Sequence, residues 1–157
     1  MTEQIHSSVP AIWFSFIAEN MEYSHAPMPE AWHFCSNKQD ADTCAMLVKA
    51  GLKTASSGAL AAYLHYKAPV PAAGDLAIIT NWEGEAQCII RTTEVEIKPF
   101  NEVTEDYAML EGEGDQTLAF WKKQHWDFFN KDLASFGQTA TEDMMVICEQ
   151  FEMVYQF

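Results

Sequence analysis

The sequence has few positive charges, and only one of them is an arginine. Its 157 residues carry eight lysines and Arg91 against 23 acidic residues, which gives a formal net charge of −14. Sequence-independent binding to nucleic acid strengthens with each phosphate that a lysine or arginine meets. The composition therefore disfavours tight binding to an extended nucleic acid, but it is compatible with a pocket for one nucleotide.

Long hydrophobic runs are also missing. No apolar run approaches the roughly 18 residues that a helix needs to cross a bilayer. The polar opening of the chain, residues 1–8, lacks the basic start and the apolar stretch of a secretory signal. We therefore predict a cytoplasmic protein that makes no contact with a membrane.

Cysteine is scarce, and the four cysteines form no C-x-x-C pair. Without a secretory signal they are predicted to be reduced thiols. The one grouping that resembles a zinc site matches no standard finger spacing; it comprises His25, His33, Cys35 and Cys44. We predict no metal and no cofactor.

Glycine and proline are too few for a disordered or fibrous chain, since there are only seven and six of them among 48% apolar residues. The length suits a single globular domain with a substantial core. No repeat, low-complexity segment or linker divides the chain. We predict one domain over residues 1–157.

Helices are predicted where apolar residues recur every three or four positions. The first follows Ser7 and Ser8 and ends near Asn20, before a loop over residues 21–30. The second begins at Asn37 or Asp40 and ends at Gly51. Further helices are expected over residues 59–66, 104–110 and 116–134, the last with Asp115 as its cap.

Strands are predicted towards the middle and the end of the chain. Residues 76–82 and 86–98 are rich in Ile, Val and Thr and flank Glu83-Gly84, which is typical of a β-hairpin turn. Apolar and polar residues alternate over residues 144–157, which predicts a last strand. Because hairpins rather than helical crossovers join these strands, we predict an α+β fold with a mostly antiparallel sheet.

Two motifs go beyond composition. Residues 51–56 read Gly-Leu-Lys-Thr-Ala-Ser, which fits G-x-K-x-x-[ST], and residues 111–129 contain E-G-E-G-D-x-x-L-x-x-W-x-x-x-H-x-x-F-F. Together they resemble the ASCH family, whose longer bacterial members are often described as predicted RNA-binding proteins. The resemblance implies a PUA-like small β-barrel with surrounding helices and an N-terminal helical extension over about residues 1–36.

The resemblance also implies an activity. A smaller ASCH relative is an amidohydrolase that removes the acetyl group from acetylated cytidine with a Lys and a Thr from K-x-x-T and a Glu. Carried over by position, these catalytic residues are Lys53, Ser56 and Glu111. Serine replaces threonine at the second position and keeps the hydroxyl.

Two mechanisms are open for these residues. A neutral Lys53 would deprotonate Ser56, or a charged Lys53 would stabilise the oxyanion while Glu111 activates water. Residues three apart on a regular strand face opposite sides, so Lys53 and Ser56 converge only in a bend or bulge. Gly51 and Gly58 make a bend credible there, and a straight strand would remove the role of Ser56.

Residues around the motif are predicted to bind the substrate: Thr54, Tyr63, Tyr66, Trp82 and Glu113. The three aromatic side chains are of the type that stacks on a base, and the expected partner is a nucleoside, a nucleotide or a short single-stranded RNA. Core packing is the competing interpretation for each aromatic residue and for His125, and a plain acidic turn is the competing interpretation for Glu113.

Other functions compete with hydrolysis. In one, a binding module or ribonuclease uses Lys53 to contact a phosphate without amide chemistry. In another, a regulatory protein presents its acidic surface to a protein partner.

Overall fold

The computed structural model describes residues 4–157, which divide into two compact units. Unit 1 comprises residues up to Gly51 together with Gly74–Arg91 and Glu152–Phe157, and unit 2 comprises Leu52–Ala73 and Thr92–Phe151. The chain therefore enters each unit more than once.

Five strands form one sheet in the order β1-β3-β4-β5-β2. Only β1 and β3 pair in parallel, whereas β3 pairs antiparallel with β4 and β2 antiparallel with β5. Their bounds are Ala31–Trp32 (β1), Ala55–Ala59 (β2), Leu76–Thr80 (β3), Ala86–Pro99 (β4) and Met145–Tyr155 (β5). The α+β class and the mostly antiparallel sheet are thus confirmed.

The sheet formed by residues 4–157 is open, and here the structure differs from the closed barrel that the resemblance implied. Closure requires the two edge strands to pair with each other. The edges here are β1 and β2, which have only two and five residues.

Unit 1 forms around α1 (Ser8–Glu19) and the hairpin of β3 and β4. The apolar stripe predicted from the sequence buries Val9, Ile12, Trp13 and Phe16, which pack in one cluster with Ile78 and Ile89 of the two strands. A short 3-10 turn, η1 (Met21–Tyr23), follows.

The second helix, α2 (Lys38–Lys49), also matches the prediction. The Asn37 side chain caps it by accepting the backbone N–H of Asp40 at 2.9 Å. Gly51 follows its end with φ +76°, a left-handed conformation that favours glycine.

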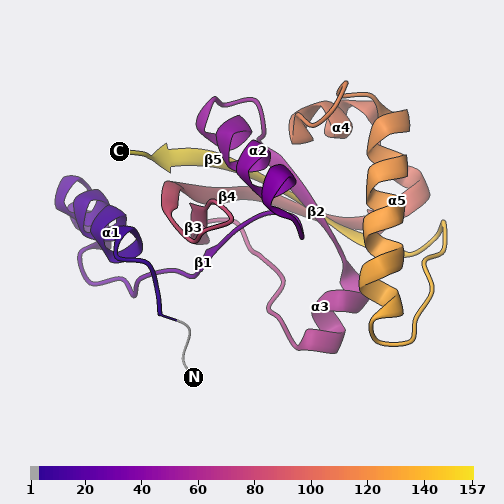
Figure 1. Cartoon of the computed structure of the whole chain (residues 1–157), viewed down its shortest axis with the longest axis horizontal. Coiled ribbons are helices and arrows are strands. Elements are labelled where there is room, and N and C mark those ends of the chain that lie inside the picture. The colour runs from indigo at the N-terminus through magenta and orange to yellow at the C-terminus, as the bar shows by residue number, and fades with distance from the viewer. Residues whose placement is uncertain (1–3) are drawn as a thin grey trace. The chain divides into compact units, whose positions relative to one another are not determined.

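Unit 2 packs helices on β2 and β5. They are α3 (Leu60–Tyr66), η2 (Phe100–Glu102), α4 (Glu105–Glu111) and α5 (Leu118–Ala134). In Figure 1, α4 lies beside the first turns of α5 and α3 beside its last turns. Phe100, Tyr107, Trp121, Phe129 and Val146 belong to the core cluster that these elements enclose. Within residues 4–157, no helix has the length and apolar character needed to cross a membrane.

The start of α5 corrects one prediction. Thr117, not Asp115, is its cap, because the Thr117 hydroxyl accepts the N–H of Phe120 at 3.1 Å. Asp115 instead accepts the N–H and the hydroxyl of Thr117. Gln116 has φ +64°, which takes it out of the helix that was expected to start there.

Candidate functional site

The segment before β2 is joined by hydrogen bonds to the end of α4. The backbone N–H of Thr54 donates to the carbonyl of Leu110 at 2.7 Å, and the Thr54 hydroxyl donates to the same carbonyl. On the other side, the Thr54 carbonyl accepts the N–H of Phe151. These contacts place the neighbouring residue, Lys53, against the last residue of α4, Glu111.

Gly112 makes this close approach possible. It ends α4 in the left-handed region, with φ +68°. A Cβ added there would lie 2.1 Å from the carbonyl oxygen of Leu52, a separation that no real side chain tolerates. The Glu111-Gly112 pair in the sequence is therefore a packing requirement as well as a helix end.

Lys53 is a buried cation between two carboxylates. Its side chain is 2% exposed, and its Nζ lies 3.4 Å from Glu111 Oε1 and 3.1 Å from Glu113 Oε2. Nζ also donates to the backbone carbonyl of Glu111 at 3.4 Å. Two carboxylates at these distances stabilise the ammonium form of the side chain.

Glu111, also 2% exposed, is the centre of the site. Its Oε2 accepts from Ser57 Oγ at 2.6 Å and from the indole N–H of Trp121, and its Oε1 lies 3.2 Å from His125 Nε2. Burial raises the pKa of the Glu111 carboxyl, but the charges of His125 and Lys53 and the hydrogen bonds outweigh burial and lower it to about 2. The carboxylate is therefore ionised at neutral pH.

His125 is the second buried basic side chain of the site. Its Nδ1 lies 2.8 Å from the carbonyl of Trp121 and its Nε2 faces the Glu111 carboxylate, so both ring nitrogens face acceptors. Burial lowers the pKa of His125, yet attraction to Glu111 and these hydrogen bonds raise it overall. With His125 protonated, two cations balance Glu111 and Glu113.

A pair of hydroxyls extends the network. The Tyr107 hydroxyl donates to the backbone carbonyl of Ser56 at 2.7 Å and lies 2.9 Å from Ser57 Oγ. Burial, followed by the charge of Glu111, raises the pKa of Tyr107, so the phenol stays neutral. Ser57 Oγ is thus held between a neutral phenol and an ionised carboxylate.

The structure brings Lys53, Glu111 and Glu113 together, and it joins them to Ser57 instead of Ser56. Residues 55–59 form the strand β2, without the bend that Ser56 required. Side chains alternate along a strand, so Ser57 points to the face of Ala55 and Ala59, which belong to the unit 2 core, and Ser56 points to the other. The even spacing from Lys53 to Ser57 is the signal that could have identified this hydroxyl.

The predicted aromatic contacts lie in different surroundings. Tyr63 packs on Gly58, where an added Cβ would lie 2.6 Å from its ring, and Tyr66 is 59% exposed with its hydroxyl 3.3 Å from Ser135 Oγ. Trp82 belongs to unit 1, where its ring lies 4.8 Å from that of His33.

Trp121 and His125 lie on the apolar face of α5, for which core packing is the simplest interpretation of the sequence. They are buried, but both also make hydrogen bonds to Glu111. Their four-residue spacing stacks the two rings on one helix face, with centroids 4.3 Å apart. Nothing in the helical pattern itself shows that this face meets a carboxylate from another element.

Three side chains have the geometry of a metal-ligand set. The ligand atoms of Glu111, Glu113 and His125 lie within 4.8 Å of one another. The Lys53 ammonium is already within 3.4 Å of both carboxylates and supplies the positive charge that an ion would bring. The two carboxylates of this donor set therefore already share a cation of the chain itself.

Gln124 lies beside Glu113 at the edge of the hydrogen-bond network. Its Nε2 donates to Glu113 Oε1 at 3.3 Å, and Glu113 is 13% exposed. The Oε1 of Gln124 is buried, and it has no hydrogen-bond partner among residues 4–157. A buried acceptor of this kind is suited to a ligand N–H or O–H.

Comparisons with known proteins agree with this fold. A family model described as ASCH domain matches residues 30–155. The crystal structure of an ASCH domain from Lactobacillus crispatus JV V101 superposes with a TM-score of 0.91 and 32% identity, covering 99% of each chain. The crystal structure of a protein from Enterococcus faecalis V583 superposes with a TM-score of 0.86 and 33% sequence identity. The match covers 94% of this chain and 88% of that protein. A comparison with curated proteins gave no significant match.

Proposed function

Because the chain belongs to the ASCH-domain family, we propose that it hydrolyses an amide on an acylated nucleoside, with acetylated cytidine as the substrate to test first. The observation that carries this proposal is the set of contacts to Glu111, whose carboxylate lies within hydrogen-bond reach of both Lys53 Nζ and Ser57 Oγ. A hydroxyl, a carboxylate and a cation at one place are the groups that acyl transfer needs.

The charge of Lys53 separates the two mechanisms that the sequence left open. A lysine acts as a base only when it is neutral, and two neighbouring carboxylates favour the ammonium. The geometry therefore supports a charged Lys53 that stabilises the oxyanion, with Glu111 as the proton acceptor.

We assign the attack to Ser57. Its Oγ bonds to the carbonyl carbon while its proton moves to Glu111, and the oxyanion forms beside the Lys53 ammonium. The C–N bond then breaks as Glu111 returns the proton to the leaving amine. Water cleaves the acyl ester in the same way, giving the free acid and restoring Ser57. Lys53 stays charged throughout.

Substrate contacts remain part of the proposal. Glu113 and Gln124 offer acceptor oxygens beside Lys53, with Thr54 as a further contact for the base or sugar. A neutral nucleoside also suits a chain of net charge −14, because it carries no phosphate to repel.

Phosphate binding by Lys53 is the weaker alternative. A phosphate would need an ammonium whose charge is available, and Lys53 is already paired with Glu111 and Glu113. An anion placed there would meet both carboxylates.

Chromatographic release of cytidine from acetylated cytidine tests the proposal. We expect Lys53→Met, Glu111→Gln and Ser57→Ala each to lower kcat/KM by about 100-fold or more, whereas Ser56→Ala keeps it within a few-fold. Ser56 is the matched control, since it is the same residue type on the other face of β2. Loss in Ser56→Ala with full activity in Ser57→Ala would instead support the K-x-x-S assignment.

Absence of turnover on a panel of acylated nucleosides would refute hydrolysis. Salt dependence of RNA binding would then decide whether a binding module replaces it, because phosphate contacts weaken as salt rises. Circular dichroism of each variant separates lost catalysis from lost folding.

A further inference from the structure

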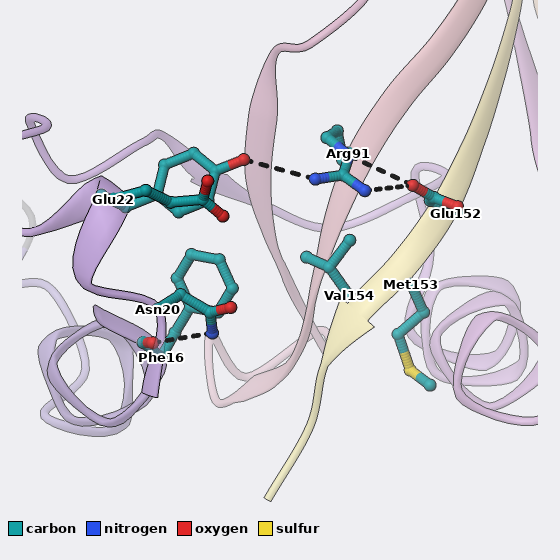
Figure 2. Close-up of a pocket in the computed structure, with 8 residues that line it drawn as sticks. Phe16, Asn20, Glu22, Arg91, Glu152, Met153 and Val154 are labelled. Atoms are coloured by element: carbon teal, nitrogen blue, oxygen red, sulfur yellow. Dashed lines mark hydrogen bonds and ion pairs between the residues drawn. The ribbon is translucent and has the colours of Figure 1, made fainter. Parts of the chain in front are cut away.

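A concave site lies wholly within unit 1, apart from the Lys53 network (Figure 2). It has a volume of about 430 Å³, within the range typical of small-molecule pockets. Its polar walls come from three places in the chain: η1 and the residue before it contribute Asn20, Glu22 and Tyr23, β4 contributes Arg91, and β5 contributes Glu152. Val154 adds an apolar surface.

Arg91, the only arginine of the chain, makes three hydrogen bonds in this pocket. Its Nε donates to Glu152 Oε1 at 3.1 Å, and its Nη2 donates to the same oxygen. Its Nη1 donates to the Tyr23 hydroxyl at 3.3 Å. Dashed lines in Figure 2 mark the contacts between Arg91 and Glu152. A guanidinium has five N–H donors, so two remain for a ligand on a group that is already oriented.

Acceptor atoms line the same pocket as this cation. Among residues 4–157, no hydrogen bond or ion pair involves the Glu22 carboxylate, the second oxygen of Glu152 or the side-chain oxygen of Asn20. The pocket therefore presents a fixed pair of donors together with a surplus of acceptors.

The charges limit what can bind. An anion would meet the carboxylates of Glu22 and Glu152, and a cation would meet the guanidinium of Arg91. A neutral, planar ligand with adjacent donors on one edge and adjacent acceptors on another satisfies both kinds of group. Guanine has this pattern, with N1–H and N2–H₂ on one edge and O6 and N7 on another, and arginine commonly pairs with O6 and N7.

We propose that this pocket binds a guanine base, with Arg91 contacting O6 and N7, the Glu22 carboxylate accepting from N1–H and N2–H₂, and the ring lying against Tyr23. The Lys53 site of unit 2 takes no part, so this proposal is independent of the hydrolysis proposed above.

Calorimetric titration of the full chain with guanosine tests the pocket. We expect inosine, which lacks the N2 amino group, to bind about tenfold or more weakly than guanosine, because one carboxylate contact is lost. Adenosine and cytidine should bind more weakly still. Guanosine binding should barely change with salt, because the base is neutral.

Variants locate the site. Glu22→Gln and Arg91→Lys should each weaken guanosine binding about tenfold or more, whereas Glu85→Gln, an exposed carboxylate of unit 1 outside the pocket, should not. Backbone amide shifts on titration should include residues 20–23 and 91.

Several results would overturn the proposal. They are equal affinities for guanosine and inosine, an unchanged affinity in a folded Glu22→Gln variant, or no saturable binding of guanosine at millimolar concentration. Displacement of guanosine by agmatine at equal concentration would show instead that the pocket selects cations.

Discussion

Replacing Gly112 by alanine should separate α4 from the segment that carries Lys53. The substitution has two effects. It puts an L residue in the left-handed conformation at φ +68°, and it places a Cβ 2.1 Å from the carbonyl oxygen of Leu52. The first costs an L residue about 1 kcal/mol. The second involves backbone, so the two segments must move apart.

That movement sets the size of the effect. It removes the hydrogen bond from Thr54 N–H to the Leu110 carbonyl, worth about 1 kcal/mol, and it separates the buried ions Lys53 and Glu111. Breaking a buried ion pair costs about 3 kcal/mol or more. We therefore expect Gly112→Ala to lower the free energy of unfolding by about 5 kcal/mol or more, and hydrolysis to fall with it.

Gly137→Ala is the matched control. Gly137 also lies after a helix of unit 2, at φ +79°, but an added Cβ would meet nothing within 4 Å. The Gly137→Ala substitution should lower the free energy of unfolding by only about 1 kcal/mol. Guanidinium denaturation measures both variants. A difference of less than about 1 kcal/mol between them, at equal m-values, would refute the argument that this contact holds the site together.

Three further predictions concern charge and capping. The pKa of Glu111 is lowered from 4.5 to about 2, so the stability that this carboxylate gives the folded protein is complete above pH 4.5 and is lost as pH falls towards 2. Carboxyl carbon NMR should show Glu111 titrating far below 4.5. A midpoint above about 4 would contradict the network. The pKa of His125 is raised above 6.5, so the stability that its protonated form gives the folded protein is complete below pH 6.5 and is lost as pH rises through the raised value. The difference in unfolding free energy between wild type and His125→Gln should therefore shrink at alkaline pH. A constant difference would argue for a neutral imidazole. Asn37→Ala should destabilise α2 by about 1 kcal/mol, because the Asp40 N–H loses its cap; thermal unfolding should show the loss, and Asn101→Ala, an exposed residue outside any cap, serves as the control.

Local signals explain why much of the fold was predictable. The stripe of α1, the Asn37 cap of α2 and the turn between β3 and β4 are encoded within a few residues of where they act. Whether the sheet closes depends instead on which strands become its edges, and no short stretch of sequence specifies that.

The charged residues of the site could be named from the sequence, but the side chains that bond to Glu111 could be named only in part. Lys53 and Glu111 lie 58 positions apart, and their meeting followed from the family resemblance, not from either segment alone. Trp121 and His125 fit an apolar helix stripe, so their bonds to Glu111 appear only once α4 and α5 pack together. Thr117 was overlooked as a cap because the more acidic Asp115 stands two positions before it.

Successive side chains of β2 point to opposite faces of the strand, and this affects how the sequences of related chains should be aligned. A single inserted residue between Lys53 and Ser57 would exchange the two faces of the strand, turning the hydroxyl away from Glu111 and moving Ala59 out of the core. An insertion of two residues would keep the faces but change the pairing of Ser57 with Cys148. We therefore expect a gap inside this five-residue stretch to mark a relative in which the Lys53 site is lost or rebuilt.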